Sequence, residues 1–228
     1  MLEKQFGGVH KRPDGTFSIT PRMPLGKLDV DDLEIIVAVI RKFNLPGIRA
    51  TTGQRVSIEG IPPDSVDEIV EMLNGVGNRT PQSIIACRGL GDCKHGLQNT
   101  QTMAMQIEDV FSDSVQIPSH LKIGLSGCAR CCGNSYIRDI GLVGTPDGWT
   151  LVIGGKAGSN VRRADDLLVD SPLELVLTTL ERFLTFYKES KQEKERVATF
   201  IERVGIDHIK SELQIPPSSP AGNDTLSD

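Results

Sequence analysis

The cysteines constrain this chain most strongly, because all five lie in two short glycine-rich segments. Cys87 and Cys93 are separated by five residues, and Cys128 and Cys132 by three, with Cys131 between the latter two. An odd number of cysteines in a chain without an export signal argues against a disulfide framework, since the cytosol keeps thiols reduced. Grouped thiols favour metal ligands, although any single cysteine could also be a small buried side chain.

Zinc and an iron–sulfur cluster are the two metal centres to compare. Structural zinc ligands usually come in pairs with two to four residues between them. A gap of five residues combined with a gap of three fits that pattern poorly. A 4Fe–4S cube is larger and tolerates wider loops around its four cysteines. The spacing therefore favours iron–sulfur and leaves zinc as the alternative.

The composition excludes several classes of protein. The chain has 228 residues, of which 38% are hydrophobic and 24% charged, as is ordinary for a globular protein. Its net charge of −5 argues against a nucleic-acid binder, because neutralising phosphates needs a basic face. No apolar run approaches the roughly 20 residues that span a bilayer, and residues 1–15 lack the apolar core of a signal peptide. We expect a cytoplasmic protein that binds neither nucleic acid nor membrane.

Residues 1–76 are predicted to form a small α/β unit. The expected strands are 16–20, 48–52 and 55–59, and the expected helices run from 30 to about 43 and from 66 to about 73. Asp29 is expected to cap the first helix, and the capping-box pattern from Ser65 to Glu68 to start the second. The order β-α-β-β-α indicates a ferredoxin-like half domain, with both helices on one face of an antiparallel sheet.

Residues 77–212 are predicted to form a second domain, and residues 213–228 a disordered tail. The expected strands are 83–86, 121–125, 139–143 and 149–153, the last two forming a hairpin; the expected helices are 97–110, 172–188 and 191–204. Each cysteine segment follows a strand that ends in a glycine-rich turn, where ligands are common. The predicted fold class is α+β, with a half domain followed by an α/β domain.

The stretch from 120 to 164 is basic within an acidic chain. It holds six basic residues and two acidic ones, the basic ones being Lys122, Arg130, Arg138, Lys156, Arg162 and Arg163. Segment 154–163 combines glycines with cations and is suited to cradling an anion. A solvated surface loop is the alternative interpretation. A P-loop is excluded because its glycine–lysine pattern is absent.

Three stretches together resemble the sirohaem-containing sulfite and nitrite reductases, over roughly residues 15–210. The first is the cysteine pattern together with the preceding Ser126 and Gly127. The second covers 139–144 and 148–155. The third, 47–55, is similar to the substrate-side motif of the family's ferredoxin-like half domain. Within the family, the chain looks most like the small, low-molecular-weight sulfite reductases of the assimilatory type.

The resemblance implies sirohaem next to a 4Fe–4S cluster, joined by one shared cysteine thiolate. By motif position, the cluster ligands would be Cys87, Cys93, Cys128 and Cys132, and Cys132 would also bridge to the sirohaem iron. Cys131 stands where many family members have a residue that is not a ligand. The residues implied to bind sirohaem are Arg49, Thr51, Gln54, Cys132, Arg162 and Arg163. The cations implied to face the substrate are Arg22, Arg55 and Lys122, with Arg49 as a further candidate.

The activity that the resemblance implies is the six-electron reduction of sulfite to sulfide. Nitrite reduction to ammonia is the alternative within the family. Outside that activity, the alternatives are a non-catalytic electron-transfer or redox-sensing iron–sulfur protein and a zinc-stabilised interaction module. No GxGxxG fingerprint for a flavin or nicotinamide is visible, so electrons are expected from a separate donor such as a ferredoxin-like protein. Larger relatives contain both modules twice, so this single copy is a candidate homo-oligomer.

Overall fold

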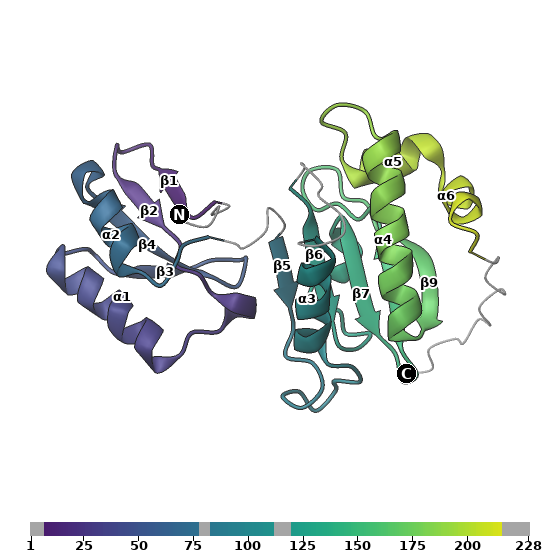
Figure 1. Cartoon of the computed structure of the whole chain (residues 1–228), viewed down its shortest axis with the longest axis horizontal. Helices are drawn as coiled ribbons and strands as arrows, with labels where there is room; N and C mark the ends of the chain where they lie inside the picture. Colours follow the sequence, from purple (N-terminus) through teal and green to yellow (C-terminus); the bar gives the residue numbers. More distant parts are fainter. Residues whose placement is uncertain (1–6, 78–82, 112–119, 216–228) are drawn as a thin grey trace. The chain divides into compact units, whose positions relative to one another are not determined.

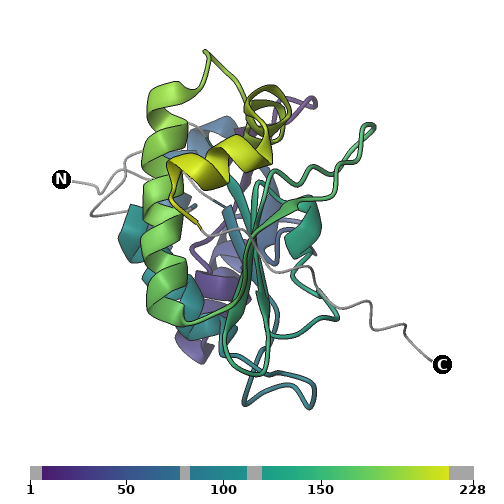
Figure 2. The same ribbon diagram turned by 90° about the vertical axis from the view of Figure 1, so that its right-hand side faces the viewer.

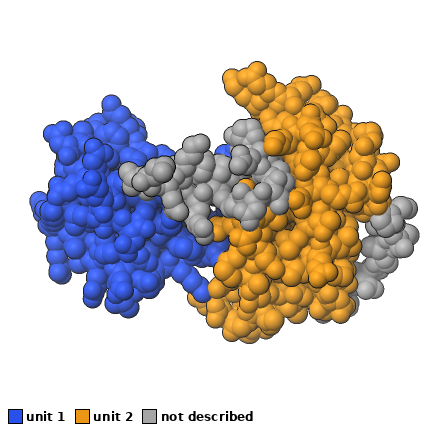
Figure 3. Space-filling view, in the orientation of Figure 1, with its two compact units in different colours: residues 1–85, 118–121 blue, residues 86–117, 122–228 orange. Residues whose placement is uncertain are grey.

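The computed structural model describes residues 7–77, 83–111 and 120–215. The chain divides into two compact units, shown in different colours in Figure 3. Unit 1 comprises residues 1–85 and 118–121, and unit 2 residues 86–117 and 122–228. The domain boundaries expected at 76 and 212 stay predictions. Of the expected tail, residues 216–228 lie outside the described residues, whereas Leu213 is buried.

Unit 1 contains a four-stranded antiparallel sheet with the strand order β1-β2-β4-β3 (Figure 1). Its strands are β1 (Val9–Lys11), β2 (Phe17–Ile19), β3 (Ile48–Ala50) and β4 (Val56–Ile61). Ala50 pairs with Val56, and Gln54 takes the left-handed φ of +58° between these strands. The two strands expected at 48–52 and 55–59 therefore pair as a hairpin.

Two helices, α1 (Val30–Lys42) and α2 (Val66–Met72), complete unit 1. Asp29 caps α1 as predicted, since its carboxylate accepts a hydrogen bond from the Asp32 amide at 2.9 Å. Ile36 of α1 and Ile69 of α2 share one apolar core with Ile58 of β4. Burying side chains of this size stabilises the fold by about 2 kcal/mol each. Both helices thus pack against the sheet through the same core.

The second sheet has five strands in the order β5-β6-β7-β8-β9. It belongs to unit 2 except for residues 83–85 of β5, which fall within unit 1. Its strands are β5 (Ser83–Ala86), β6 (Lys122–Ser126), β7 (Ile140–Gly144), β8 (Trp149–Ile153) and β9 (Asp165–Ser171). β6 and β7 are parallel, whereas β7, β8 and β9 are antiparallel to one another in turn. The hairpin expected from β7 and β8 is confirmed. The ends of β5 and β6 deliver the two cysteine segments.

Four helices flank this sheet: α3 (Thr100–Asp109), α4 (Leu173–Ser190), α5 (Val197–Val204) and α6 (Ile206–Glu212). The long α4 runs along one face of the sheet (Figures 1 and 2). It buries Phe183 and Tyr187 completely, and the Phe200 ring of α5 lies edge-on to Tyr187 with the ring centroids 5.1 Å apart. Among the described residues, no helix has the length and apolarity needed to cross a membrane.

Three helix starts differ from expectation. The helix expected from 97 begins at Thr100, because the Asn99 side chain caps it. Ser65 makes no side-chain cap, because its φ of −101° and ψ of −4° lie near the helical region, whereas a capping residue needs extended backbone. The last long helix was expected from 191 but begins at Val197. The preceding loop is held by Glu195, which accepts hydrogen bonds from the Gln192 amide at 2.9 Å and from Arg203 at 2.8 Å.

Candidate functional site

The first cysteine loop begins where β5 ends. The Cys87 amide donates to the Leu125 carbonyl at 2.9 Å, which keeps this cysteine on the sheet. The buried Thr100 hydroxyl donates to the Cys87 carbonyl at 2.6 Å. Further along, the Cys93 amide donates to the Gly89 carbonyl at 3.0 Å. Both cysteines are therefore positioned by hydrogen bonds of their own backbone.

Gly127 joins the two cysteine loops. Its amide donates to the Cys87 sulfur at 3.1 Å, and its carbonyl accepts from the amides of Leu97 and Gln98 at 2.8 and 3.1 Å. A β-carbon on Gly127 would lie 2.8 Å from both the Gln98 carbonyl oxygen and the Gly89 α-carbon. Only glycine fits here, so the close approach of the loops depends on this residue.

The second cysteine loop follows β6, and two buried serine hydroxyls hold it by hydrogen bonds. Ser126 Oγ accepts from the Gly133 amide at 3.0 Å and lies 2.8 Å from Ser135 Oγ. Ser135 Oγ donates onward to the Leu142 carbonyl of β7 at 2.9 Å. Sequence reasoning found Ser126 only as part of a motif and missed Ser135, because this role depends on residues that meet only in the folded chain.

All five cysteines are free thiols. Cys132 is exposed, and the other four are half-buried. In the second loop, the Cys131 amide donates to the Cys128 carbonyl at 3.2 Å, and Cys131 takes a left-handed φ of +51°. Burial, followed by the neighbouring thiols Cys128 and Cys132, raises the pKa of Cys131.

Among the described residues, the thiols are not grouped as ligands of a single metal ion. Across the described ranges, no three His, Cys, Asp or Glu side chains come close enough together to hold one ion. Zinc binds thiolates at about 2.3 Å, so its ligands must crowd around one point. The thiolates of a cluster bind separate irons and stand farther apart. The argument for a cluster over zinc therefore stays with the ligand spacing in the sequence, which is five residues in one loop and three in the other.

The two arginines of the glycine-rich loop differ in their surroundings. The Arg162 side chain has three partners. Its Nη1 donates to the Gly154 carbonyl at 2.9 Å. Its guanidinium also forms ion pairs with Asp165 at 2.5 Å and with Glu202 at 3.4 Å. Arg163 is exposed, and its guanidinium lies 4.0 Å from the centroid of the Tyr136 ring. Tyr136 was not predicted, and no signal in the sequence links it to Arg163.

The predicted sirohaem and substrate residues of unit 1 gather at the β3–β4 hairpin, apart from Arg22. Arg49 forms a two-fold hydrogen bond with Glu59 at 2.8 and 3.1 Å, which raises the pKa of the arginine. The Thr51 hydroxyl donates to the Arg55 carbonyl at 3.1 Å, and Gln54 lies in the turn. The hairpin thus brings Arg49, Thr51, Gln54 and Arg55 together.

The other two cations predicted to face the substrate lie on different elements. Arg22 donates its amide to the Gly75 carbonyl at 2.9 Å, and a β-carbon on Gly75 would lie 3.3 Å from the Arg22 guanidinium carbon. Lys122 begins β6 in unit 2 and has an exposed side chain, while its amide donates to the buried Asp139 carboxylate at 2.9 Å.

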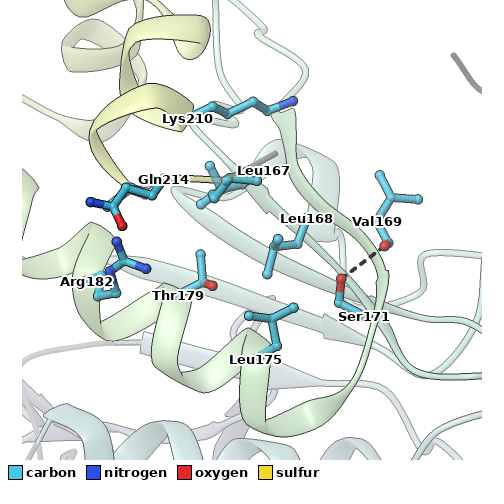
Figure 4. Close-up of a pocket in the computed structure, with 11 residues that line it drawn as sticks. Leu167, Leu168, Val169, Ser171, Leu175, Thr179, Arg182, Lys210 and Gln214 are labelled. Atoms are coloured by element: carbon cyan, nitrogen blue, oxygen red, sulfur yellow. Dashed lines mark hydrogen bonds between the residues drawn. The ribbon is translucent and has the colours of Figure 1, made fainter. Parts of the chain in front are cut away.

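A cavity of about 250 Å³ in unit 2 is lined by none of the predicted site residues. It lies between β9, α4 and the end of α6, with Leu168 and Leu175 along its apolar side (Figure 4). Arg182 and Lys210 stand at its edge. No cysteine lines this cavity, so it is not assigned a role in the chemistry of the cysteine loops.

Two family models match the chain in sequence order. The nitrite/sulfite reductase ferredoxin-like half domain matches residues 10–76. The nitrite and sulphite reductase 4Fe-4S domain matches residues 77–219, which is more than half of the chain. The chain belongs to the nitrite and sulfite reductase family. The predicted family and the oxidoreductase class are confirmed.

Relatives within this family include both activities. An assimilatory-type sulfite reductase of Nitratidesulfovibrio vulgaris is 34% identical over 92% of this chain and 98% of its own length. An NAD(P)H nitrite reductase of Bacillus subtilis is 31% identical over 94% of this chain, but that covers 27% of the relative. The NADH nitrite reductase large subunit of Escherichia coli is 30% identical over 87% of this chain and 24% of its own length.

Solved structures agree on the fold. The NirA protein of Mycobacterium tuberculosis matches with a TM-score of 0.74 at 19% identity, over 90% of this chain and 41% of that one. Dissimilatory sulfite reductase I matches with a TM-score of 0.72 at 15% identity, over 93% of this chain and 73% of that one. The predicted α+β fold class is therefore confirmed.

The cofactors of this reductase family member are sirohaem and a 4Fe–4S cluster. The residues present fit the cluster, because four of the five thiols are half-buried and one is exposed on two loops that meet. At that meeting point a backbone N–H of the second loop donates to a cysteine sulfur of the first. Hydrogen bonds to cluster sulfurs are one means by which a protein sets the potential of such a centre. The exposed Arg163 offers a cation for a sirohaem carboxylate, whereas the pairs made by Arg162 suit a structural role.

Proposed function

We propose that this reductase converts sulfite to sulfide with six electrons that arrive from a separate donor protein. The observation that carries the proposal is the match to an assimilatory-type sulfite reductase over 98% of that relative's length. The nitrite reductases are far longer, since this chain spans about a quarter of the two named above. Nitrite reduction to ammonia is the second candidate, because their identities of 31% and 30% are close to 34%.

Four cysteines are proposed as cluster ligands: Cys87, Cys93, Cys128 and Cys132. Cys132 is proposed to share its thiolate with the sirohaem iron, which its exposed position supports. Cys131 is left as a non-ligand whose half-buried thiol lies in the turn between Cys128 and Asn134. Sirohaem and the cluster together supply single-electron delivery to a bound anion.

The cations of the chain are proposed to hold the anionic groups. Sirohaem carboxylates would be bound by Arg49, Thr51, Gln54 and Arg163, with Arg162 holding the loop through its own ion pairs. Arg22, Arg55 and Lys122 would attract the oxyanion and polarise the oxygens that leave as water. Arg49 must exchange Glu59 for a cofactor carboxylate, so that one carboxylate partner of the guanidinium replaces another.

Anaerobic purification followed by iron, acid-labile sulfide and tetrapyrrole analysis tests the cofactors. Steady-state turnover with reduced methyl viologen then compares sulfite with nitrite. A higher kcat/KM for sulfite supports the proposal, and a higher value for nitrite assigns the second candidate. Cofactor-loaded protein that reduces neither anion would indicate electron transfer or redox sensing. We also infer a cytoplasmic location and a homo-oligomer; fractionation and light scattering test these two points.

A further inference from the structure

The loop that carries Cys87 and Cys93 exposes two apolar side chains beside the proposed cluster ligands. Leu90 is 54% exposed and Leu97 is 43% exposed. The two lie on adjoining segments, because the Leu90 amide donates to the carbonyl of Gln98 at 2.9 Å. In Figure 1 this loop projects beyond the ends of β5 and α3. Adjoining exposed leucines at a functional loop are typical of an interaction surface.

Three exposed cations lie on the two cysteine loops, which meet where the Gly127 carbonyl accepts from the Leu97 amide at 2.8 Å. Arg88 and Lys94 belong to the same loop, and Arg130 to the second cysteine loop. Within the ranges that the structure describes, none of the three forms an ion pair. Asp92 is the acid of this loop, and its Oδ2 lies 3.5 Å from Gln101 Nε2. The surface is therefore net positive although the chain carries a net charge of −5.

The cluster-loop patch is defined here as Arg88, Leu90, Lys94, Leu97 and Arg130. We propose that this patch is the docking surface for an acidic electron-transfer protein, a proposal that rests on the function proposed above. At each encounter one electron leaves the reduced donor, which is oxidised, and enters the cluster, which is reduced. Arg88 follows Cys87 and Lys94 follows Cys93 directly, so the docked donor lies next to the proposed ligands.

The chemistry of the patch suits a donor that must leave after each electron. A small apolar centre with a charged rim is the usual anatomy of a transient interface, and electron-transfer encounters are among the smallest interfaces. Positive charge steers an acidic partner and raises its association rate without fixing it in place. Repeated encounters are needed, because sulfite reduction takes six electrons.

A second copy of the chain fits this patch less well. A two-fold symmetric contact through this patch would place it against the same patch of the other copy. Arg88, Lys94 and Arg130 would then face the cations of the partner copy, and like charges opposed across an interface are unfavourable. The charge of the patch therefore favours a partner of opposite sign.

The test compares two electron sources on the full-length, cofactor-loaded protein. One source is a reduced acidic 2Fe–2S ferredoxin of the plant type, and the other is reduced methyl viologen. The measured quantity is the ratio of the two kcat/KM values for sulfite-dependent oxidation of the donor. The variant K94E/R130E reverses two charges of the patch, and R182E/K188E reverses one arginine and one lysine on α4 as a matched control. Iron and sulfide content is measured for each protein.

We expect the ratio to fall about tenfold or more in K94E/R130E and less than twofold in R182E/K188E. For the unmodified protein, added salt should slow the ferredoxin-driven rate far more than the dye-driven rate. If K94E/R130E does not load its cluster, L90S is measured instead and should show the same loss. An unchanged ratio, or an equal fall in the control, would overturn the proposal.

A calorimetric titration measures the binding of oxidised ferredoxin to the cofactor-loaded protein. It tests the docking surface independently of the proposed function. Weaker binding by K94E/R130E than by R182E/K188E supports the docking surface even where no sulfite is reduced. Absence of dye-driven turnover with either anion would refute the proposed function alone. Equal ferredoxin binding by both variants would refute the docking surface alone.

Discussion

The amide of Gly127 donates a hydrogen bond to the sulfur of Cys87 across 3.1 Å. These residues lie 40 positions apart in the sequence and begin the two turns that carry all five cysteines. The contact makes the two loops one structural feature. A hydrogen bond to the sulfur also favours the thiolate, which is the form that binds iron.

Replacing Gly127 with alanine is expected to separate the loops. The added β-carbon would lie 2.8 Å from two backbone atoms, which cannot rotate away. Overpacking of this kind costs about 1–3 kcal/mol. The expected result is a lower urea midpoint and less iron and labile sulfide per chain.

Gly53→Ala is the control for this substitution. The nearest atom to a β-carbon at Gly53 is Thr51 Oγ1, 3.8 Å away, and its φ is not in the left-handed region. This variant should keep the urea midpoint and iron content of the unmodified protein. A G127A protein that matches the control in both measurements would contradict the role assigned to Gly127.

Serine substitutions at Cys131 and Cys132 should have different effects. Cys132 is exposed and proposed as the shared ligand, whereas Cys131 is half-buried in the turn. C132S is expected to lose sirohaem or its coupling to the cluster, and C131S to keep both. Optical spectra and electron paramagnetic resonance of anaerobic protein measure this. The opposite pattern would move the bridging role to Cys131.

Local signals predicted the elements whose stabilising contacts are close in sequence. Asp29 and Asp32 cap α1 within a single turn, and the β3–β4 hairpin closes around Gly53 and Gln54. β9 was not predicted, because Asp165 and Asp166 open it and mask the apolar pair that follows. β1, with all three residues exposed, gives no alternation to detect.

The candidate site shows the same division between local and distant contacts. The cysteines and their glycines were visible in the sequence, since ligand spacing is a local property. The ion pair of Arg162 with Glu202 was not visible, because Glu202 lies 40 positions further along. The contact between Ser126 and Ser135 depends on the pairing of β6 with β7, which no residue pattern specifies.

The stability of the protein should fall as the pH rises from 10 to about 12. Burial is the main cause that raises the pKa of Tyr187 from 10.0 to about 12, with Asp139 and Glu195 adding to it. In the unfolded chain this phenol ionises near pH 10, whereas in the folded protein it stays protonated up to about pH 12. Between these two pH values ionisation therefore favours the unfolded state, and the free energy of unfolding falls. A difference of about two units corresponds to about 2–3 kcal/mol.

The variant Y187F isolates this effect. It loses the hydrogen bond to the Glu195 carbonyl, at 2.5 Å, which lowers stability by about 1 kcal/mol at neutral pH. Between pH 10 and 12 its free energy of unfolding should then fall less steeply than that of the unmodified protein. Y136F changes the other tyrosine of the chain. Its free energy of unfolding should still show the decrease between pH 10 and 12 that comes from Tyr187. Equal slopes in Y187F and the unmodified protein would contradict the assignment.

Arg22→Ala should raise the KM for sulfite while the cofactors stay bound. The expectation follows from the role proposed for Arg22, a half-buried cation whose guanidinium packs against Gly75 in unit 1. Removing a positive charge weakens the attraction of the oxyanion, so a KM increase of about tenfold or more is expected. R22K keeps the charge but not the planar fork and should recover part of the loss. Loss of tetrapyrrole from R22A would instead make Arg22 a cofactor ligand, and an unchanged KM with a lower urea midpoint would leave it a structural role against Gly75.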